Sequence, residues 1–125
     1  MTRSLLWIDC SAGAAVGVGM LALHVPMAHW YELPVGLLLG MGAANLVYAS
    51  FSLSLARDPD RSLGRVSQLA VANMAWGLVC LALTAMFRGE ASWLGIGHLV
   101  LEALFVGGLG LVEWRVRHRM TGMPG

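Results

Sequence analysis

The sequence predicts an all-α integral membrane protein, folded as an antiparallel, up-down bundle of four transmembrane helices. Hydrophobic residues make up 58% of the 125 residues and charged residues only 12%, whereas an average soluble domain has roughly 25% charged residues. A soluble chain of this length exposes too large a share of its surface to hide so much apolar area. The apolar residues also fall into four separate stretches, which we interpret as one membrane domain over residues 1–125.

Each apolar stretch has the length that a membrane requires. The predicted spans are approximately residues 5–25, 34–56, 66–87 and 92–114. About 20 helical residues cross a hydrocarbon core of about 30 Å, and lipid offers no other partners for backbone N–H and C=O groups, so each span must be a helix. The short connections between the spans are residues 24–33, 57–65 and 88–91. Short connections make consecutive helices antiparallel.

The basic residues predict the orientation in the membrane. Arg88 lies at one predicted end of the bundle, and the other seven arginines lie at the opposite end: Arg3, Arg57, Arg61, Arg65, Arg115, Arg117 and Arg119. Arginine-rich ends face the cytoplasm, so we expect a multi-pass protein of the bacterial inner (plasma) membrane with both termini cytoplasmic. The connection at residues 57–65 should be a solvated turn, in which Asp58 and Asp60 offset the arginines.

Glycines indicate how the helices meet. The chain has 16 glycines, and Gly13 with Gly17, and Gly36 with Gly40, form patterns that let helix backbones approach closely in lipid. Gly77 and the "GGLG" at residues 107–110 extend the pattern to the third and fourth spans. Such glycines pack the helices of one chain or join copies of the chain, so a homo-oligomer is one expectation.

Polar residues recur at helical spacing on each span in turn. The first span has Asp9 and His24 on one face, and the second has Asn45, Tyr48 and Ser52. On the third span, one face carries Asn73, Trp76, Cys80 and Thr84. On the fourth, Glu102 lies four residues after His98, and Glu113 lies about three turns after Glu102. Four polar stripes avoid lipid if they face one another.

The depths of these residues predict three levels inside the bundle. Asp9 and Glu113 should form an acid pair near the cytoplasmic end, because the first and last helices of a bundle are usually neighbours. Asn45, Asn73 and Glu102 should form a cluster near the midplane, with His98 one turn above Glu102, and His24 and His98 should lie toward the outer face. Alternatively, arginines (Arg3, Arg65 or Arg115) pair with the acids, the asparagines are interhelical hydrogen-bond partners, and the histidines are interfacial.

Glu102 suggests the main functional hypothesis. A lone carboxylate in hydrocarbon costs several kcal/mol, so it has to be neutral, partnered or next to water. An intramembrane ionisable residue is by default a functional candidate. We therefore expect a small polytopic membrane protein that binds or conducts a proton, ion or small molecule at Glu102, surrounded by Asn45, Asn73 and His98.

Two other classes of function remain open. One is a non-catalytic accessory or scaffold subunit of a larger membrane complex, since no catalytic constellation occurs in the sequence and we expect no enzyme. The other is a haem or copper site at the outer face, formed by residues with suitable imidazole or thioether ligands: Met20, Met27, His24, His29 and His98. We otherwise expect no cofactor, and the net charge of +1 gives no reason to expect a nucleic-acid partner.

Several segments resemble a known group of proteins. "LLWID", "LLLGMGAANLVYASFSLSLAR", "VANMAW" and "EWRVR" are similar to small bacterial inner-membrane proteins of four spans that have no assigned activity. The resemblance covers nearly the whole chain. It implies a four-helix inner-membrane bundle and transfers no catalytic residues. Small multidrug-resistance transporters have a similar size, but their functional glutamate lies in the first helix, where this chain has Asp9.

Overall fold

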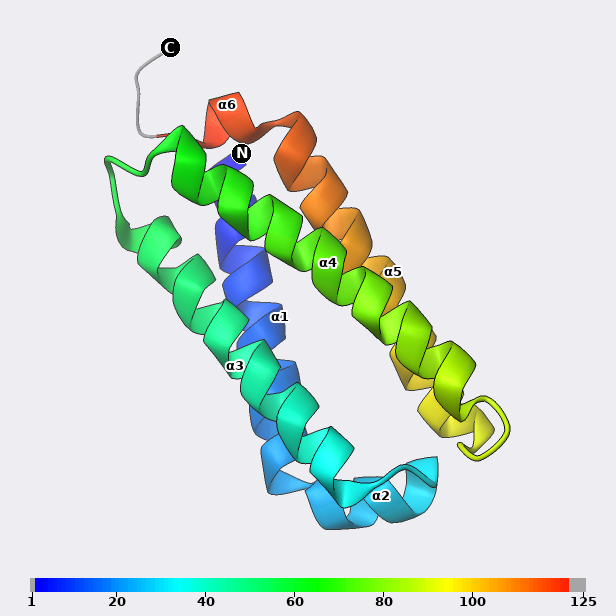
Figure 1. Ribbon diagram of the computed structural model, residues 1–125. Coiled ribbons are helices and arrows are strands. Elements are labelled where there is room, and N and C mark those ends of the chain that lie inside the picture. Colours follow the sequence, from blue (N-terminus) through cyan, green and yellow to red (C-terminus); the bar gives the residue numbers. More distant parts are fainter. Residues whose placement is uncertain (1, 122–125) are drawn as a thin grey trace.

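A computed structural model describes residues 2–121, and over these residues the chain folds into helices without strands. The helices are α1 (Thr2–Ala22), α2 (His24–Tyr31), α3 (Val35–Arg57), α4 (Leu63–Phe87), α5 (Trp93–Arg115) and α6 (Arg117–Met120). Four of them, α1, α3, α4 and α5, are long and apolar enough to cross a membrane (Figure 1). The chain is therefore a four-helix, multi-pass membrane protein, as the composition predicts.

The membrane helices begin and end within three residues of the predicted spans. Serines mark two of the starts. The Ser62 hydroxyl accepts a hydrogen bond from the backbone N–H of Arg65, and the Ser92 hydroxyl accepts one from Gly95. Each serine thus caps the first turn of α4 or α5, where backbone N–H groups lack helical partners.

The predicted connection at residues 24–33 is wrong, because most of it forms the short helix α2. Pro26 explains why this helix is separate from α1. Proline has no N–H to donate to the Ala22 carbonyl, and its ring crowds that carbonyl, so α1 ends at Ala22. The helix α2 ends at Tyr31, and the next residue, Glu32, has a left-handed φ of 54°. This helix lies across one end of the bundle (Figure 1).

Glycines join the membrane helices into two close pairs, α1 with α3 and α4 with α5. A Cβ atom at Gly17 would lie 2.9 Å from the Gly42 carbonyl oxygen, and one at Gly77 would lie 2.9 Å from the Cα atom of Gly107. Only glycine allows these backbone approaches. Gly36 and Gly40 do not follow the prediction, because nothing lies within 4 Å of a Cβ atom at either position.

The two pairs approach each other less closely than the helices within a pair. Few residues of α1 lie near α5, and few of α3 lie near α4. The expectation that the first and last membrane helices are close neighbours is therefore wrong, since α1 packs on α3. A space remains between the pairs at mid-height, and the polar stripes face into it.

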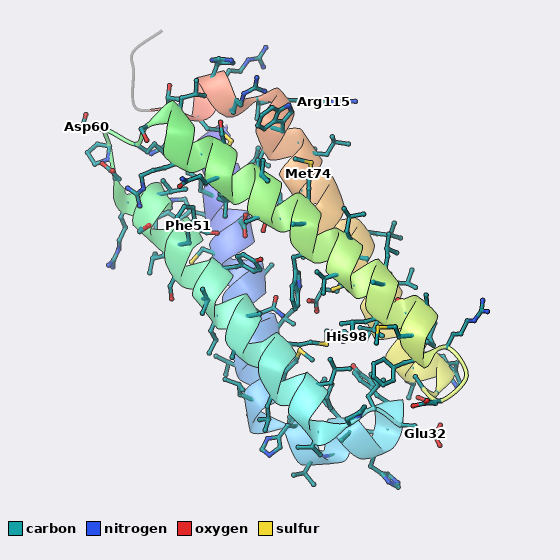
Figure 2. The ribbon with its side chains drawn as sticks, in the orientation of Figure 1. Glu32, Phe51, Asp60, Met74, His98 and Arg115 are labelled. Carbon is teal, nitrogen blue, oxygen red and sulfur yellow. The ribbon has the colours of Figure 1, made fainter. Side chains whose placement is uncertain are left out.

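Apolar clusters close this space at both ends. One cluster lies at the end that holds the start of α1 and α6: Leu6, Leu55, Ala56, Val66, Leu69 and Met120. The other lies at the α2 end: Met20, Met27, Leu33, Leu38, Met41 and Leu99. Figure 2 shows the two ends, with Glu32 near α2, Asp60 and Arg115 at the opposite end, and His98 between them.

The turn between α3 and α4 is mostly exposed, as predicted. Arg61 is the exception, since only 8% of its surface is exposed. Its guanidinium donates to the backbone carbonyls of Met120, Leu55 and Asp58. These bonds attach α6 to the turn. The expected pairing of Asp58 with arginine is confirmed, since its carboxylate lies 3.2 Å from Arg65 Nη1.

Candidate functional site: an intramembrane polar cavity

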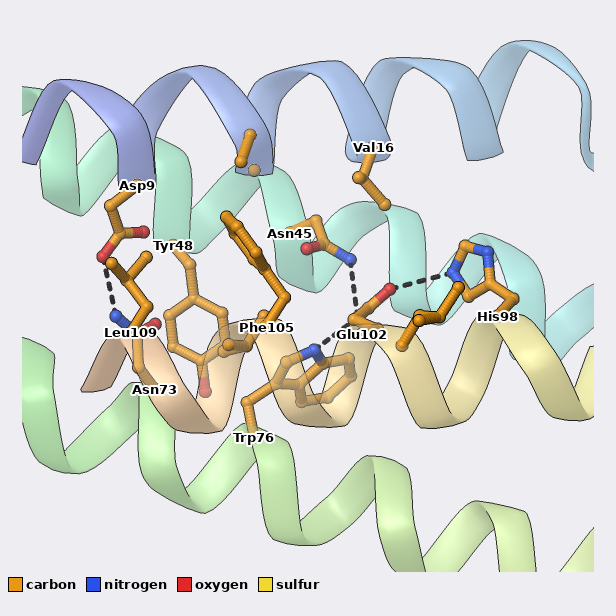
Figure 3. A pocket seen from close by; sticks show the side chains of 14 residues that line it. Asp9, Val16, Asn45, Tyr48, Asn73, Trp76, His98, Glu102, Phe105 and Leu109 are labelled. Carbon is orange, nitrogen blue, oxygen red and sulfur yellow. Dashed lines mark hydrogen bonds and ion pairs between the residues drawn. The ribbon is translucent and has the colours of Figure 1, made fainter. Parts of the chain in front are cut away.

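A cavity of about 340 Å³ lies between the two helix pairs (Figure 3). This volume falls in the range of ligand pockets, about 300–1,000 Å³. Most of its lining is apolar, and seven residues contribute polar groups: Asp9, Asn45, Tyr48, Asn73, Trp76, His98 and Glu102. The polar stripes of α1, α3, α4 and α5 therefore meet at one cavity.

Glu102 is the most heavily hydrogen-bonded residue of the cavity wall. Its Oε1 lies 2.9 Å from Nε2 of His98. Its Oε2 accepts from the indole N–H of Trp76 at 2.6 Å, from the Asn45 amide at 3.2 Å and from the Cys80 thiol at 3.7 Å. Four side chains from three helices thus contact a carboxylate that is only 8% exposed.

These contacts explain how an apolar span tolerates Glu102. Burial of a carboxylate is costly unless hydrogen bonds replace the water that it loses. Trp76 has only a donor, and the Asn45 nitrogen has only donors, so both suit an acceptor. The predicted grouping of Asn45 and His98 with Glu102 agrees with the structure, whereas Trp76 and Cys80 take the place predicted for Asn73.

His98 connects Glu102 to Tyr31 at the end of α2. Its Nδ1 lies 3.0 Å from the Tyr31 hydroxyl, and with Nε2–H donating to Glu102 this pattern fits a neutral imidazole. Burial, and secondarily the charge of Glu102, raise the pKa of the Tyr31 phenol above its ordinary value of 10.0. The phenol therefore keeps its proton at neutral pH and can donate it to Nδ1.

The sequence holds no signal for the inward direction of the Tyr31 side chain. That direction depends on α2. The Tyr31 carbonyl accepts from the Ser92 backbone N–H at 2.8 Å, and a Cβ atom at Gly95 would lie 2.6 Å from the same carbonyl oxygen. The end of α2 is thus fixed against the start of α5, one turn from His98.

A second cluster contains the predicted acid pair. The Asn73 amide nitrogen donates to Asp9 Oδ2 and to Glu113 Oε1, both at 2.7 Å. Asn73 was predicted to surround Glu102, and this is wrong because its position on α4 is one turn nearer the α6 end than that of Trp76. Asp9 and Glu113 do come together, with exposed fractions of 6% and 0%.

The alternative pairing of these acids with arginines finds no support among the described side chains. Arg65 contacts Asp58 and Ser54 instead, and Arg115 is exposed. The side chain of Arg3 lies outside the described part of the chain. Asn73 is thus the residue that joins the two acids.

The residues predicted for an outer metal or haem site do not form one group, because their surroundings differ. His24 Nδ1 lies 2.7 Å from the carbonyl oxygen of Leu21 at the end of α1, His29 is exposed, and Met20 and Met27 belong to an apolar cluster. Within residues 2–121, no three His, Cys, Asp or Glu side chains are grouped as a metal site requires. His24 and His98 therefore differ in role, since only His98 lines the cavity.

The cavity also reaches the outer surface of the bundle. Leu101 and Phe105 on α5 line it, and they are 69% and 49% exposed. Val16 on α1 lines it as well, so the cavity extends between α1 and α5, where the backbones are far apart. In a membrane-spanning bundle, this side of the cavity faces the hydrocarbon of the bilayer.

Comparisons with known proteins found no matching family model, no similar curated protein and no similar solved structure. The resemblance to small four-span bacterial proteins stays a prediction.

Proposed function

We propose that this membrane protein binds a small, mostly apolar, membrane-soluble molecule in the cavity beside Glu102. The observation that carries the proposal is the combination of an apolar wall with a few converging polar groups, which is typical of ligand sites. Trp76, Tyr48 and Phe105 line the cavity and offer large apolar faces to such a ligand.

Binding is better supported than conduction. A pathway for ions or protons requires access from both aqueous sides, but apolar clusters close the space above and below the cavity. The open side lies between α1 and α5, next to Leu101 and Phe105. A ligand that is dissolved in the bilayer can enter there without crossing either cluster.

Purification from native membranes in a mild detergent tests the proposal. We expect a membrane-soluble compound, identified by mass spectrometry, to accompany the chain at a fixed ratio. Ala12 lines the cavity, and Ala15 on the same helix is exposed. Ala12→Phe fills the cavity and should lose the compound, whereas Ala15→Phe should retain it. Equal recovery from both variants, or no compound with the wild type, would contradict the proposal.

A second pair of variants tests the role of the carboxylate. Glu102→Gln keeps the shape of the side chain but replaces an acceptor oxygen by an N–H₂ group, which faces the donors of Trp76 and Asn45. We expect weaker retention of the compound, measured as its molar ratio to protein. Glu90→Gln, on the exposed connection between α4 and α5, is the control and should retain the wild-type ratio.

The positions of the arginines support a location in the inner membrane, with the α6 end of the bundle in the cytoplasm. The starts of α1 and α6 lie at the same end of the bundle (Figure 1). Single cysteines at Asp60 and Glu90 test this orientation with an impermeant maleimide applied to intact cells. Glu90→Cys should be labelled and Asp60→Cys should not, with the parent chain as the baseline. The reverse pattern would overturn the orientation.

A further inference from the structure

The acid cluster at Asp9 and Glu113 has a feature that hydrogen bonding to Asn73 leaves unexplained. Glu113 is fully buried, and its Oε2 atom has no hydrogen-bond partner. A buried carboxylate oxygen without a donor is costly. Asn73 brings the carboxyl group of Asp9 next to that of Glu113, since its amide nitrogen lies 2.7 Å from an oxygen of each. Two carboxylates can share a hydrogen bond only if one of them carries a proton.

We infer that Asp9 and Glu113 form a binding site for one exchangeable proton. Like charges in contact and away from water cannot both persist without a cation. A single proton on Glu113 turns its orphan oxygen into a donor and Asp9 into the acceptor. The Asn73 amide then stabilises the one remaining negative charge. Protonation thus accounts for the orphan oxygen and for the shared amide together.

The surroundings supply no competing positive charge among the described side chains. The other titratable or charged groups at this end are Cys10 on α1, Tyr48 and Arg57 on α3, Asp58, Asp60 and Arg61 on the turn between α3 and α4, Arg65 on α4, Arg115 on α5, and Arg117, His118 and Arg119 on α6. The Arg61 guanidinium donates to the backbone carbonyls of Met120, Leu55 and Asp58, and Arg57 is exposed. Arg65 contacts Asp58, and Arg117 bonds the Trp114 carbonyl and stacks on its ring. Arg115, His118 and Arg119 are exposed. Neither ion pair of the described residues involves Asp9 or Glu113.

A proton fits this site better than a metal cation does. Cations such as Na⁺ or Ca²⁺ require several oxygen ligands, but Asn73 directs its amide nitrogen at both carboxyl groups. Within residues 2–121, no three acidic, His or Cys side chains are placed so that they could hold a metal ion together. The site differs from the Glu102 cluster, where neutral donors surround a lone carboxylate. Asp9 lines the cavity, so the proton lies at its wall.

Infrared spectroscopy of the purified chain in sodium-free lipid vesicles tests the site without any ligand. We expect the C=O absorption of a buried protonated carboxyl group at neutral pH, with a shift in D₂O as the proton exchanges. Glu113→Gln should lose this absorption, because Asp9 then accepts from two amides and can remain charged. Glu102→Gln, which alters the other carboxyl group of the cavity wall, should retain it.

Three outcomes would overturn the inference. The first is the absence of the absorption from the wild type. The second is its loss in Glu102→Gln, which would place the proton on the other cluster. The third is an absorption that disappears when sodium chloride replaces choline chloride at constant pH, since this would assign the site to a metal cation. If Glu113→Gln does not fold, the wild type and Glu102→Gln still decide each of these.

Discussion

Asn45 on α3 donates a hydrogen bond of 3.2 Å to Glu102 on α5, across the space between the two helix pairs. Asn73 on α4 makes the equivalent connection to Asp9 on α1. Within each pair the helix backbones meet at glycines, and at mid-height buried polar groups connect the two pairs. This division leaves room for a cavity and places carboxyl groups on its wall.

Loss of the Glu102 carboxylate should destabilise the fold. Glu102→Leu leaves the buried donors of Trp76 and Asn45 without an acceptor, and each unsatisfied group costs about 1–3 kcal/mol. We expect a loss of at least about 2 kcal/mol in the free energy of unfolding, measured by SDS titration in mixed micelles with circular dichroism. Glu90→Leu on the exposed connection should change it by no more than about 0.5 kcal/mol. Equal effects would show that the network contributes little.

Two glycines of one motif should respond in opposite ways to alanine. A Cβ atom at Gly110 would lie 2.7 Å from the Ala70 carbonyl oxygen, whereas nothing lies within 4 Å at Gly108. Gly110→Ala should therefore separate α4 from α5 and cost about 1–3 kcal/mol. Gly108→Ala should be neutral or slightly stabilising, because alanine favours a helix more than glycine does. The same unfolding assay decides between these outcomes.

Removal of the Tyr31 hydroxyl should change the alkaline stability of the protein. Because the pKa of Tyr31 is raised above 10.0 in the folded chain, the unfolded chain loses this proton first as the pH rises. The associated stability is complete below about pH 10 and declines as the pH passes the folded value. Tyr31→Phe should show a shallower decline above pH 10, measured by thermal unfolding between pH 8 and about 11. A decline as steep as that of the wild type would refute the assignment.

Arg61 should hold α6 against the rest of the bundle. Arg61→Ala removes the donors to the carbonyls of Met120 and Leu55, and we expect faster amide hydrogen exchange in α6. Arg57 lies four residues away and is exposed, so Arg57→Ala should leave the exchange rates near those of the wild type. Unchanged exchange in Arg61→Ala would show that apolar packing of Met120 alone retains α6.

The sequence predicts the four membrane helices well because their signal is local. Apolar length and charged boundaries are properties of each segment by itself, and Glu102 is conspicuous in any apolar span. The acid pair is also predictable, since Asp9 and Glu113 lie at similar depths near one end. Helical spacing thus identifies most polar residues of the cavity wall.

The pairing of the helices could not be predicted in the same way. Gly13, Gly36 and Gly77 carry the same pattern, but only the positions that meet another backbone contribute to packing, and Gly36 faces outward. The two candidate partners of Asn73, Glu102 and the acid pair, differ by about one helical turn in depth. Which of them Asn73 contacts depends on whether α1 packs on α3 or on α5. Tyr31 was missed because its direction is set by the contact between α2 and α5, far apart in the sequence.

A high-resolution map of the protein in lipid nanodiscs prepared without detergent tests the proposed binding site most directly. We predict non-protein density between α1 and α5 that passes Leu101 and Phe105 and ends beside Glu102 and its partners. The Ala12→Phe variant should lack this density. A wild-type map in which side chains fill the cavity, or in which Glu102 faces lipid rather than Asn45 and Trp76, would contradict the proposal.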